Sequence, residues 1–190
     1  VMILSGFLGN RYAQKFPLAI SAHIAMEQSY GYVDGDSASM AELICLISAL
    51  IHSPIDQSFA ITGSVNQYGE AQAIGGVNEK IEGFFRLCNA RGLTGKQGVI
   101  IPAANQRNLV LHDDVLKAVE AGEFHIYCVR HVDEAIHLLL DREPGLADAE
   151  GNFPEGSVNG EIIRRLEAIA RMADPSRKNG VSSEDDASVK

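Results

Sequence analysis

The chain has 190 residues, of which 46% are hydrophobic and 22% are charged, and its formal net charge is −9 at pH 7. This size and composition are typical of a single globular domain, and the acidic balance argues against nucleic acid as a partner. Because the sequence has no signal peptide and no apolar run long enough to span a bilayer, it predicts a cytoplasmic protein without a membrane partner. The cysteines Cys45, Cys88 and Cys128 each lie in an apolar run, so we expect reduced and buried thiols.

The N-terminal part is predicted to contain two strands. The first covers Val1 to Leu8, is cut short at its N-terminal end, and leads into a polar loop over Gly9 to Lys15. The second covers Pro17 to Glu27, where apolar residues alternate along one face. A loop over residues 28–36 then leads to a helix over Ser37 to Ile51, which is apolar almost all round and is therefore expected in the core.

After Ile51 the sequence alternates between short strands and helices. The expected strands cover residues 59–65, 71–74, 98–102 and 124–129, and the expected helices cover residues 77–91, 113–121 and 132–141. This order predicts an α/β domain built from a mixed sheet with packed helices.

The C-terminal part changes in composition. Residues 143–158 are rich in Pro, Gly, Ala and acidic side chains and are interpreted as a linker. Helical spacing of apolar residues predicts a C-terminal helix over residues 159–173 that docks on the domain. The polar tail, residues 174–190, is expected to be disordered.

One serine lies where a turn leads into the apolar helix. Ser37 follows Asp34-Gly35-Asp36, and the first turn of a helix offers free N–H groups and a positive dipole end that stabilise an oxyanion. Helix capping is the alternative role for such a serine. Ser39 and Glu42 fit a capping box, which makes Ser39 the better cap and leaves Ser37 free to act as a nucleophile.

Lys80 is the candidate base. It lies in the first turn of the helix over residues 77–91, where the dipole disfavours a cation, and it flanks an apolar stripe one turn from Phe84. Both effects favour the neutral amine, although a surface lysine with no special role is the alternative. Thr62, at a strand end, either holds that amine or is simply a β-branched strand residue.

The histidines and glycines give weaker signals. His23 lies in an apolar strand, where it is either a core histidine or a catalytic group. The other histidines and the cysteines show no metal-ligand spacing, so no metal is expected. Gly75-Gly76 is not a dinucleotide motif and no Walker motif is present, so this chain is not expected to bind ATP by itself.

Taken together, four segments resemble the proteolytic domain of Lon proteases. They are Asp34-Gly35-Asp36-Ser37-Ala38, Ile61-Thr62-Gly63, Ile74-Gly75-Gly76-Val77-Asn78-Glu79-Lys80, and Val99-Ile100-Ile101-Pro102 followed by Asn105. The resemblance implies that residues 1–142 form a Lon-type peptidase domain with a ribosomal protein S5 domain 2-like fold.

The resemblance also implies roles for individual residues. Ser37 would be the nucleophile and Lys80 its base, in a Ser–Lys dyad that uses no histidine. Thr62, Asp34 and Asp36 would support the dyad, and His23 falls where the family often has a histidine upstream of the serine.

The sequence around Ser37 departs from the housekeeping Lon pattern, Asp-Gly-Pro-Ser-Ala-Gly. Asp36 replaces the proline and Ser39 replaces the last glycine. Glu27-Gln28-Ser29-Tyr30-Gly31 and the segment from Gly75 to Phe85 resemble a bacterial branch of Lon-related ATP-dependent proteases. These changes leave the dyad residues in place.

The resemblance implies a serine endopeptidase that hydrolyses unfolded or damaged proteins. In the family, an AAA+ module precedes this domain and supplies ATP and Mg²⁺ binding, and the subunits assemble as homo-oligomers that form hexameric rings. The alternative function is a non-catalytic assembly or substrate-holding module with the same fold.

Overall fold

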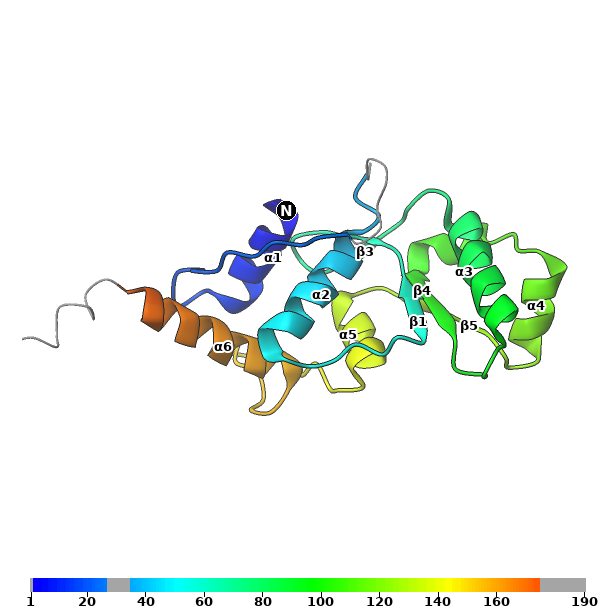
Figure 1. Cartoon of the computed structure of the whole chain (residues 1–190). Helices are drawn as coiled ribbons and strands as arrows, with labels where there is room; N and C mark the ends of the chain where they lie inside the picture. Colours follow the sequence, from blue (N-terminus) through cyan, green and yellow to red (C-terminus); the bar gives the residue numbers. More distant parts are fainter. Residues whose placement is uncertain (1, 27–34, 175–190) are drawn as a thin grey trace, which may run out of the picture.

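The computed structural model of the chain describes residues 2–26 and 35–174 (Figure 1). The helices are α1 (Met2–Tyr12), α2 (Ser39–Ile51), α3 (Val77–Arg91), α4 (Asp113–Glu120), α5 (Val132–Leu140) and α6 (Val158–Ala173), with a 3-10 helix, η1, over Ala103–Asn108. The strands are β1 (Phe59–Ile61), β2 (Ser64–Val65), β3 (Ala71–Gln72), β4 (Gly98–Pro102) and β5 (His125–Val129). The predicted α/β class is therefore confirmed.

The strands form two separate sheets rather than the mixed sheet that the sequence predicts. Strands β1, β4 and β5 form a parallel sheet in the order β1-β4-β5, with Phe59 opposite Gly98 and Gly98 opposite His125. Strands β2 and β3 form an antiparallel pair. The strand expected over residues 59–65 is interrupted at Thr62 and Gly63, because the chain turns there from the first sheet towards the second.

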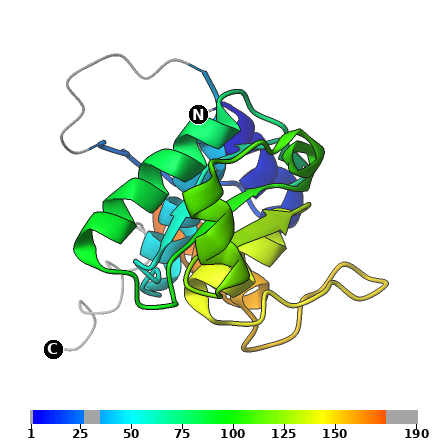
Figure 2. The ribbon, with the colours of Figure 1, turned by 90° about the vertical axis from the view of Figure 1, so that its right-hand side faces the viewer.

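Apolar side chains of β4 point alternately to the two faces of the parallel sheet and contribute to a core on each face. Successive side chains of a strand point to opposite faces, and a parallel sheet is normally covered on both. Ile100 packs into a cluster with buried residues of α1, α2, α5 and α6, whereas Val99 and Ile101 pack into a second cluster with residues of α3 and α4. Figure 1 shows the first group of helices to the left of the sheet, and Figure 2 looks at the molecule from the side of α3 and α4.

The predicted N-terminal strand over Val1 to Leu8 is wrong. Residues 2–12 form helix α1, so the loop expected over Gly9 to Lys15 is also helical as far as Tyr12. The buried side chains of α1 follow helical spacing, and they are Leu4, Phe7, Leu8 and Tyr12.

The second predicted strand, over Pro17 to Glu27, is not formed in the part that the structure describes. Residues 17–26 have no regular secondary structure, because neither described sheet pairs with them. Leu18 and Ile20 nevertheless pack against the first core cluster, whereas Ile24 is exposed. Of the loop predicted over residues 28–36, residues 28–34 lie outside the described residues.

Several later elements agree closely with the sequence prediction. Helix α3 has the predicted bounds, strand β4 likewise, and α6 begins one residue earlier than expected. Helix α6 docks as predicted, since its Val158, Ile162 and Leu166 are buried in the first core cluster. The tail beyond Asp174 lies outside the described residues.

The cysteines are free, but the prediction of three buried thiols is wrong for two of them. Cys88 is buried on α3, Cys128 is partly buried on β5, and Cys45 is exposed on α2. Cys45 is exposed because α2 buries one broad face and not its whole circumference. None of the helices in the described ranges is both long enough and apolar enough to cross a membrane.

A network of charged and polar side chains joins α1, α5 and α6. Arg11 Nη2 lies 2.5 Å from Asp133 Oδ2, and Asn159 Nδ2 donates to Asp133 Oδ1 at 3.3 Å. His131 Nδ1 lies 3.3 Å from Asp133 Oδ2. Burial raises the pKa of Asp133, but the hydrogen bond with His131 and the charge of Arg11 outweigh it and lower that pKa. The hydrogen bond with Asp133 raises the pKa of His131 against the effect of burial.

Candidate active site

The side chains of Ser37 and Lys80 meet beside the carboxyl end of β1. Lys80 Nζ, in the first turn of α3, donates to Ser37 Oγ at 2.9 Å and to Thr62 Oγ1 at 3.3 Å. Ser37 lies in the turn that precedes α2, and Thr62 follows the last residue of β1. Open parallel sheets commonly carry their sites at this edge, because side chains from several connections converge there.

Backbone hydrogen bonds hold the nucleophile candidate in place. The Ser37 carbonyl accepts from Gly63 N–H at 2.9 Å and from the Thr62 hydroxyl at 3.3 Å. Thr62 therefore contacts both members of the pair, accepting from the lysine and donating to the serine backbone. This agrees with the expectation that a Thr62 hydroxyl lies near the amine.

The capping role predicted for Ser39 is wrong. The N-cap of α2 is Ala38, which makes no side-chain cap, and Ser39 is the first residue of the helix. The Ser39 hydroxyl instead accepts from Val65 N–H at 3.0 Å. A contact across the fold has replaced the local one.

A tight turn and a buried amide position Lys80. Gly76 precedes α3 with a φ of 66°, a backbone conformation that favours glycine, and the Lys80 N–H bonds back to the Gly76 carbonyl. Two residues before Gly76, Ile74 is held by the buried side chain of Asn105, which donates to the Ile74 carbonyl at 2.8 Å and accepts from its N–H at 3.0 Å. The start of α3 is thus fixed to the end of β4 through η1.

Lys80 flanks the apolar stripe of α3, as predicted, but the stripe does not withdraw its side chain from water. Lys80 is exposed, whereas its neighbour Ile81 is completely buried. The apolar stripe of α3 faces the sheet through Ile81 and Phe85, and Phe84 is only partly buried. Lys80 therefore lies at the rim of this stripe.

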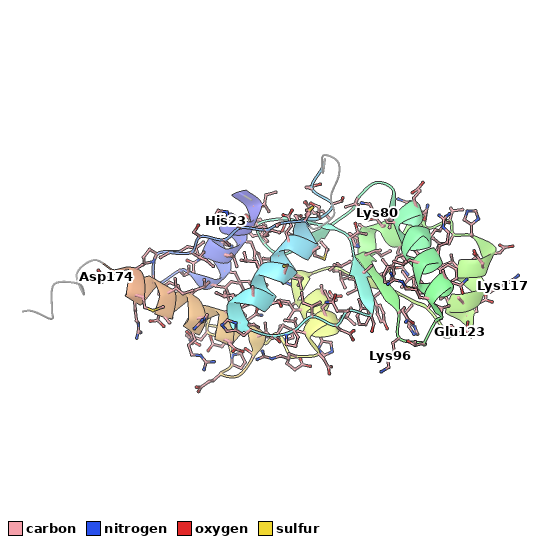
Figure 3. All side chains as sticks on the ribbon, in the orientation of Figure 1. His23, Lys80, Lys96, Lys117, Glu123 and Asp174 are labelled. Atoms are coloured by element: carbon pink, nitrogen blue, oxygen red, sulfur yellow. The ribbon has the colours of Figure 1, made fainter. Side chains whose placement is uncertain are left out.

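The residues expected to support the Ser37–Lys80 pair lie in different parts of the molecule. His23 is exposed in an irregular segment, so the core histidine expected in a strand is not found. Figure 3 shows His23 well away from Lys80 at the start of α3. Asp36 is exposed next to Ser37, and Asp34 lies outside the described residues. Ser64, which sequence reasoning does not single out, donates to Asp36 Oδ2 at 2.5 Å.

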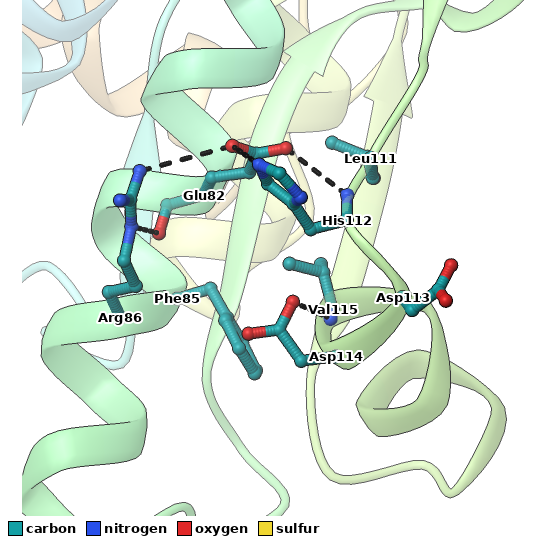
Figure 4. Close-up of a pocket in the computed structure, with 8 residues that line it drawn as sticks. All are labelled: Glu82, Phe85, Arg86, Leu111, His112, Asp113, Asp114 and Val115. Carbon is teal, nitrogen blue, oxygen red and sulfur yellow. Dashed lines mark hydrogen bonds and ion pairs between the residues drawn. The ribbon is translucent and has the colours of Figure 1, made fainter.

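A cleft of about 680 Å³ lies elsewhere, between α3 and the start of α4 (Figure 4). Within it, Glu82 Oε1 accepts from the His112 backbone N–H at 3.2 Å, and Glu82 Oε2 lies 3.4 Å from His112 Nε2. Arg86 Nη2 lies 3.9 Å from the same oxygen. The two contacts between Glu82 and His112 fix α3 to the segment before α4. Neither Ser37 nor Lys80 lines the cleft.

Across the described ranges, no group of three or more His, Cys, Asp or Glu side chains is arranged to hold a metal ion. A serine hydroxyl in hydrogen-bond contact with a lysine amine is an arrangement suited to nucleophilic catalysis, in which the amine acts as the base. Serine hydrolases that use a Ser–Lys pair have this arrangement of side chains.

The family follows from comparison with known proteins. Residues 12–142 match the Lon protease C-terminal proteolytic domain, and the chain belongs to this family. It is 57% identical over 141 residues to a protein of Escherichia coli named as a Lon protease homolog, covering 74% of this chain and 24% of that protein. A Haemophilus influenzae protein of the same name is 46% identical over 181 residues, covering 94% of this chain and 29% of that protein.

An archaeal Lon protease of Methanocaldococcus jannaschii is 40% identical over 119 residues, covering 63% of this chain and 16% of that protein. The chain therefore spans less than a third of the length of each of these three relatives.

Proposed function

We propose that the chain is a serine endopeptidase domain in which Ser37 is the nucleophile and Lys80 the general base. The observation that carries the proposal is the 2.9 Å contact between Lys80 Nζ and Ser37 Oγ. The Thr62 hydroxyl orients the amine, because it accepts from Lys80 while its own proton is used on the Ser37 carbonyl. We assign the domain a ribosomal protein S5 domain 2-like fold.

Acylation begins when neutral Lys80 takes the proton of Ser37 Oγ as the oxygen attacks the scissile carbonyl carbon. The carbonyl oxygen becomes an oxyanion, and backbone N–H groups near Ser37 stabilise it. The tetrahedral intermediate collapses, the C–N bond breaks, and Lys80 gives its proton to the leaving amine. Water then attacks the acyl-enzyme ester with Lys80 as the base again, which releases the second product and restores Ser37.

The base must be uncharged when it accepts the proton. Lys80 lies in the first turn of α3, where the helix dipole is positive. A polypeptide bound over Ser37 would also cover the exposed amine and remove water from it. Substrate binding thus supplies the desolvation that the free chain lacks.

The substrates proposed are unfolded or damaged proteins, because an extended chain is needed to present a peptide bond to the partly buried Ser37. In the whole protein, we propose an AAA+ module that uses ATP and Mg²⁺ to deliver them, and a homo-oligomeric, hexameric assembly. The proposed location is the cytoplasm.

The test is covalent labelling of Ser37 by a fluorophosphonate or a peptide boronate, together with cleavage of casein. Wild type should be labelled and should cleave casein, Ser37→Ala should do neither, and the exposed Ser21→Ala should match wild type. Thermal melts of all three proteins check folding. Equal casein cleavage by Ser37→Ala would overturn the assignment, and an unlabelled but folded wild type would favour a non-catalytic module.

A further inference from the structure

Consecutive residues after β1 make a continuous set of hydrogen bonds to the segment that carries Ser37. Thr62 and Gly63 both donate to the Ser37 carbonyl, and Gly63 in turn accepts from Met40 N–H at 3.1 Å. Val65 N–H donates to the Ser39 hydroxyl at 3.0 Å. These contacts fix the backbone on the helical side of Ser37.

Ser64 supplies the contact on the other side of the nucleophile. Its side chain is buried, with the residue only 2% exposed, and its hydroxyl donates to Asp36 Oδ2 at 2.5 Å, with Gln72 Oε1 further away at 3.5 Å. A serine hydroxyl has a single proton to donate, and a hydrogen bond to a carboxylate is stronger than one to a neutral amide. The Asp36 carboxylate is therefore the preferred acceptor.

Asp36 has few other restraints. It is exposed, and its side chain forms no ion pair with Lys80 or another cation within the described part of the chain. Its carbonyl accepts from Ser39 N–H at 3.0 Å, which is a bond local to the turn. The contact with Ser64 is thus the long-range anchor of the residue immediately before the nucleophile.

We propose that Ser64 is a positioning residue that acts through Asp36 to hold Ser37 Oγ at the Lys80 amine. The inference rests on the function proposed above. Ser64 lies on β2, which is buried, so the bond transfers the rigidity of the fold to an exposed turn. A nucleophile displaced by a fraction of an ångström reacts more slowly, because attack requires a narrow range of distance and angle.

The first experiment is a double-mutant cycle on casein or peptide hydrolysis with Ser64→Ala, Asp36→Ala and the double variant. Ser64→Ala should lower kcat by about tenfold with KM nearly unchanged, as expected for one lost hydrogen bond to a charged group. In the Asp36→Ala background, Ser64→Ala should cause no further loss. Ser48→Ala, which removes a hydroxyl bonded to the Ser53 carbonyl at 2.6 Å elsewhere on α2, is the matched control and should keep wild-type kcat.

An equal loss of kcat in both backgrounds would show that Ser64 does not act through Asp36 and would overturn the proposal. If Ser64→Ala does not fold, Asp36→Ala tests the same bond from its exposed end and should show the same tenfold loss. Unchanged kcat in Asp36→Ala would also overturn it.

The second experiment does not depend on catalysis. Amide hydrogen exchange of Gly63, measured by NMR, reports how often the bond from Gly63 N–H to the Ser37 carbonyl opens. Exchange should speed up about tenfold in Ser64→Ala and stay at the wild-type rate in Ser48→Ala. An unchanged rate in Ser64→Ala would refute positioning, whereas a wild type that fails to label at Ser37 would refute the proposed function alone.

Discussion

Replacing Asn105 by alanine tests how the lysine-bearing helix is anchored. The Asn105 side chain is buried and makes two hydrogen bonds to the backbone of Ile74, at 2.8 Å to the carbonyl and 3.0 Å from the N–H. Alanine removes both partners and leaves the Ile74 groups to partial hydration, since Ile74 is itself half-buried. The turn at Gly76 and helix α3 would then lose their link to the end of β4.

The magnitude follows from these two bonds. A neutral hydrogen bond contributes about 1 kcal/mol, so Asn105→Ala should lower the free energy of unfolding by about 2 kcal/mol. In a chain of this size, this corresponds to a melting temperature lowered by about 4–8 °C. Peptidase activity at low temperature should also fall, because Lys80 lies a few residues beyond Ile74.

The assay is urea unfolding followed by circular dichroism, with Asn89→Ala as the control. Asn89 is exposed on α3, the helix that carries Lys80, so its replacement should change the unfolding free energy little. If Asn105→Ala unfolds at the same urea concentration as wild type, the two bonds contribute nothing and the anchoring argument fails.

Three further predictions concern other contacts. Ser157→Ala removes the hydroxyl that caps α6 by accepting from Gly160 N–H at 3.1 Å, and should cost about 1 kcal/mol in urea unfolding; no change would rule out this cap. The pKa of His131 is raised in the folded state, so protonated His131 stabilises the fold. This stabilisation is complete below about pH 6.5, the pKa of an unfolded histidine, and is lost as the pH rises through the folded-state pKa. The urea midpoint of wild type should thus fall more between about pH 6 and pH 8 than that of His131→Asn, and parallel curves would show that the bond with Asp133 does not stabilise the fold. Lys80→Arg should be inactive in casein cleavage at all mildly alkaline pH values, because a guanidinium stays protonated, and substantial activity would exclude Lys80 as the base.

The sequence predicts the bounds of an element correctly when the whole pattern that defines it lies within or next to that element. Helix α3 has an apolar stripe and a following glycine, Gly92, and strand β4 is a short apolar run, so both are predicted with their bounds. The N-terminal helix is not predicted, because Val1 to Leu4 is a continuous apolar run, which has no periodicity of its own. The helical spacing of Leu4, Phe7 and Leu8 is the signal that would correct this prediction.

The site can be predicted in part for a similar reason. Ser37 and Lys80 stand out through their positions at helix starts and through the resemblance to Lon proteases, and the structure brings them into contact. The bond between Ser64 and Asp36 joins residues 28 positions apart, and no local pattern marks it. Burial of Ser64 and exposure of Lys80 likewise depend on how the elements pack, which periodicity alone does not determine.

The position of the proposed dyad between two cores has a consequence for the timing of its assembly. Ser37 precedes α2, which packs in one core, and Lys80 belongs to α3, which packs in the other. The two side chains can meet only after both cores have formed on the parallel sheet. A chain that is still folding, or one in which either core has opened, therefore lacks a complete Ser–Lys pair. Reactivity of Ser37 during refolding would then appear with the last docking event, and it would measure the fully native fraction of the population.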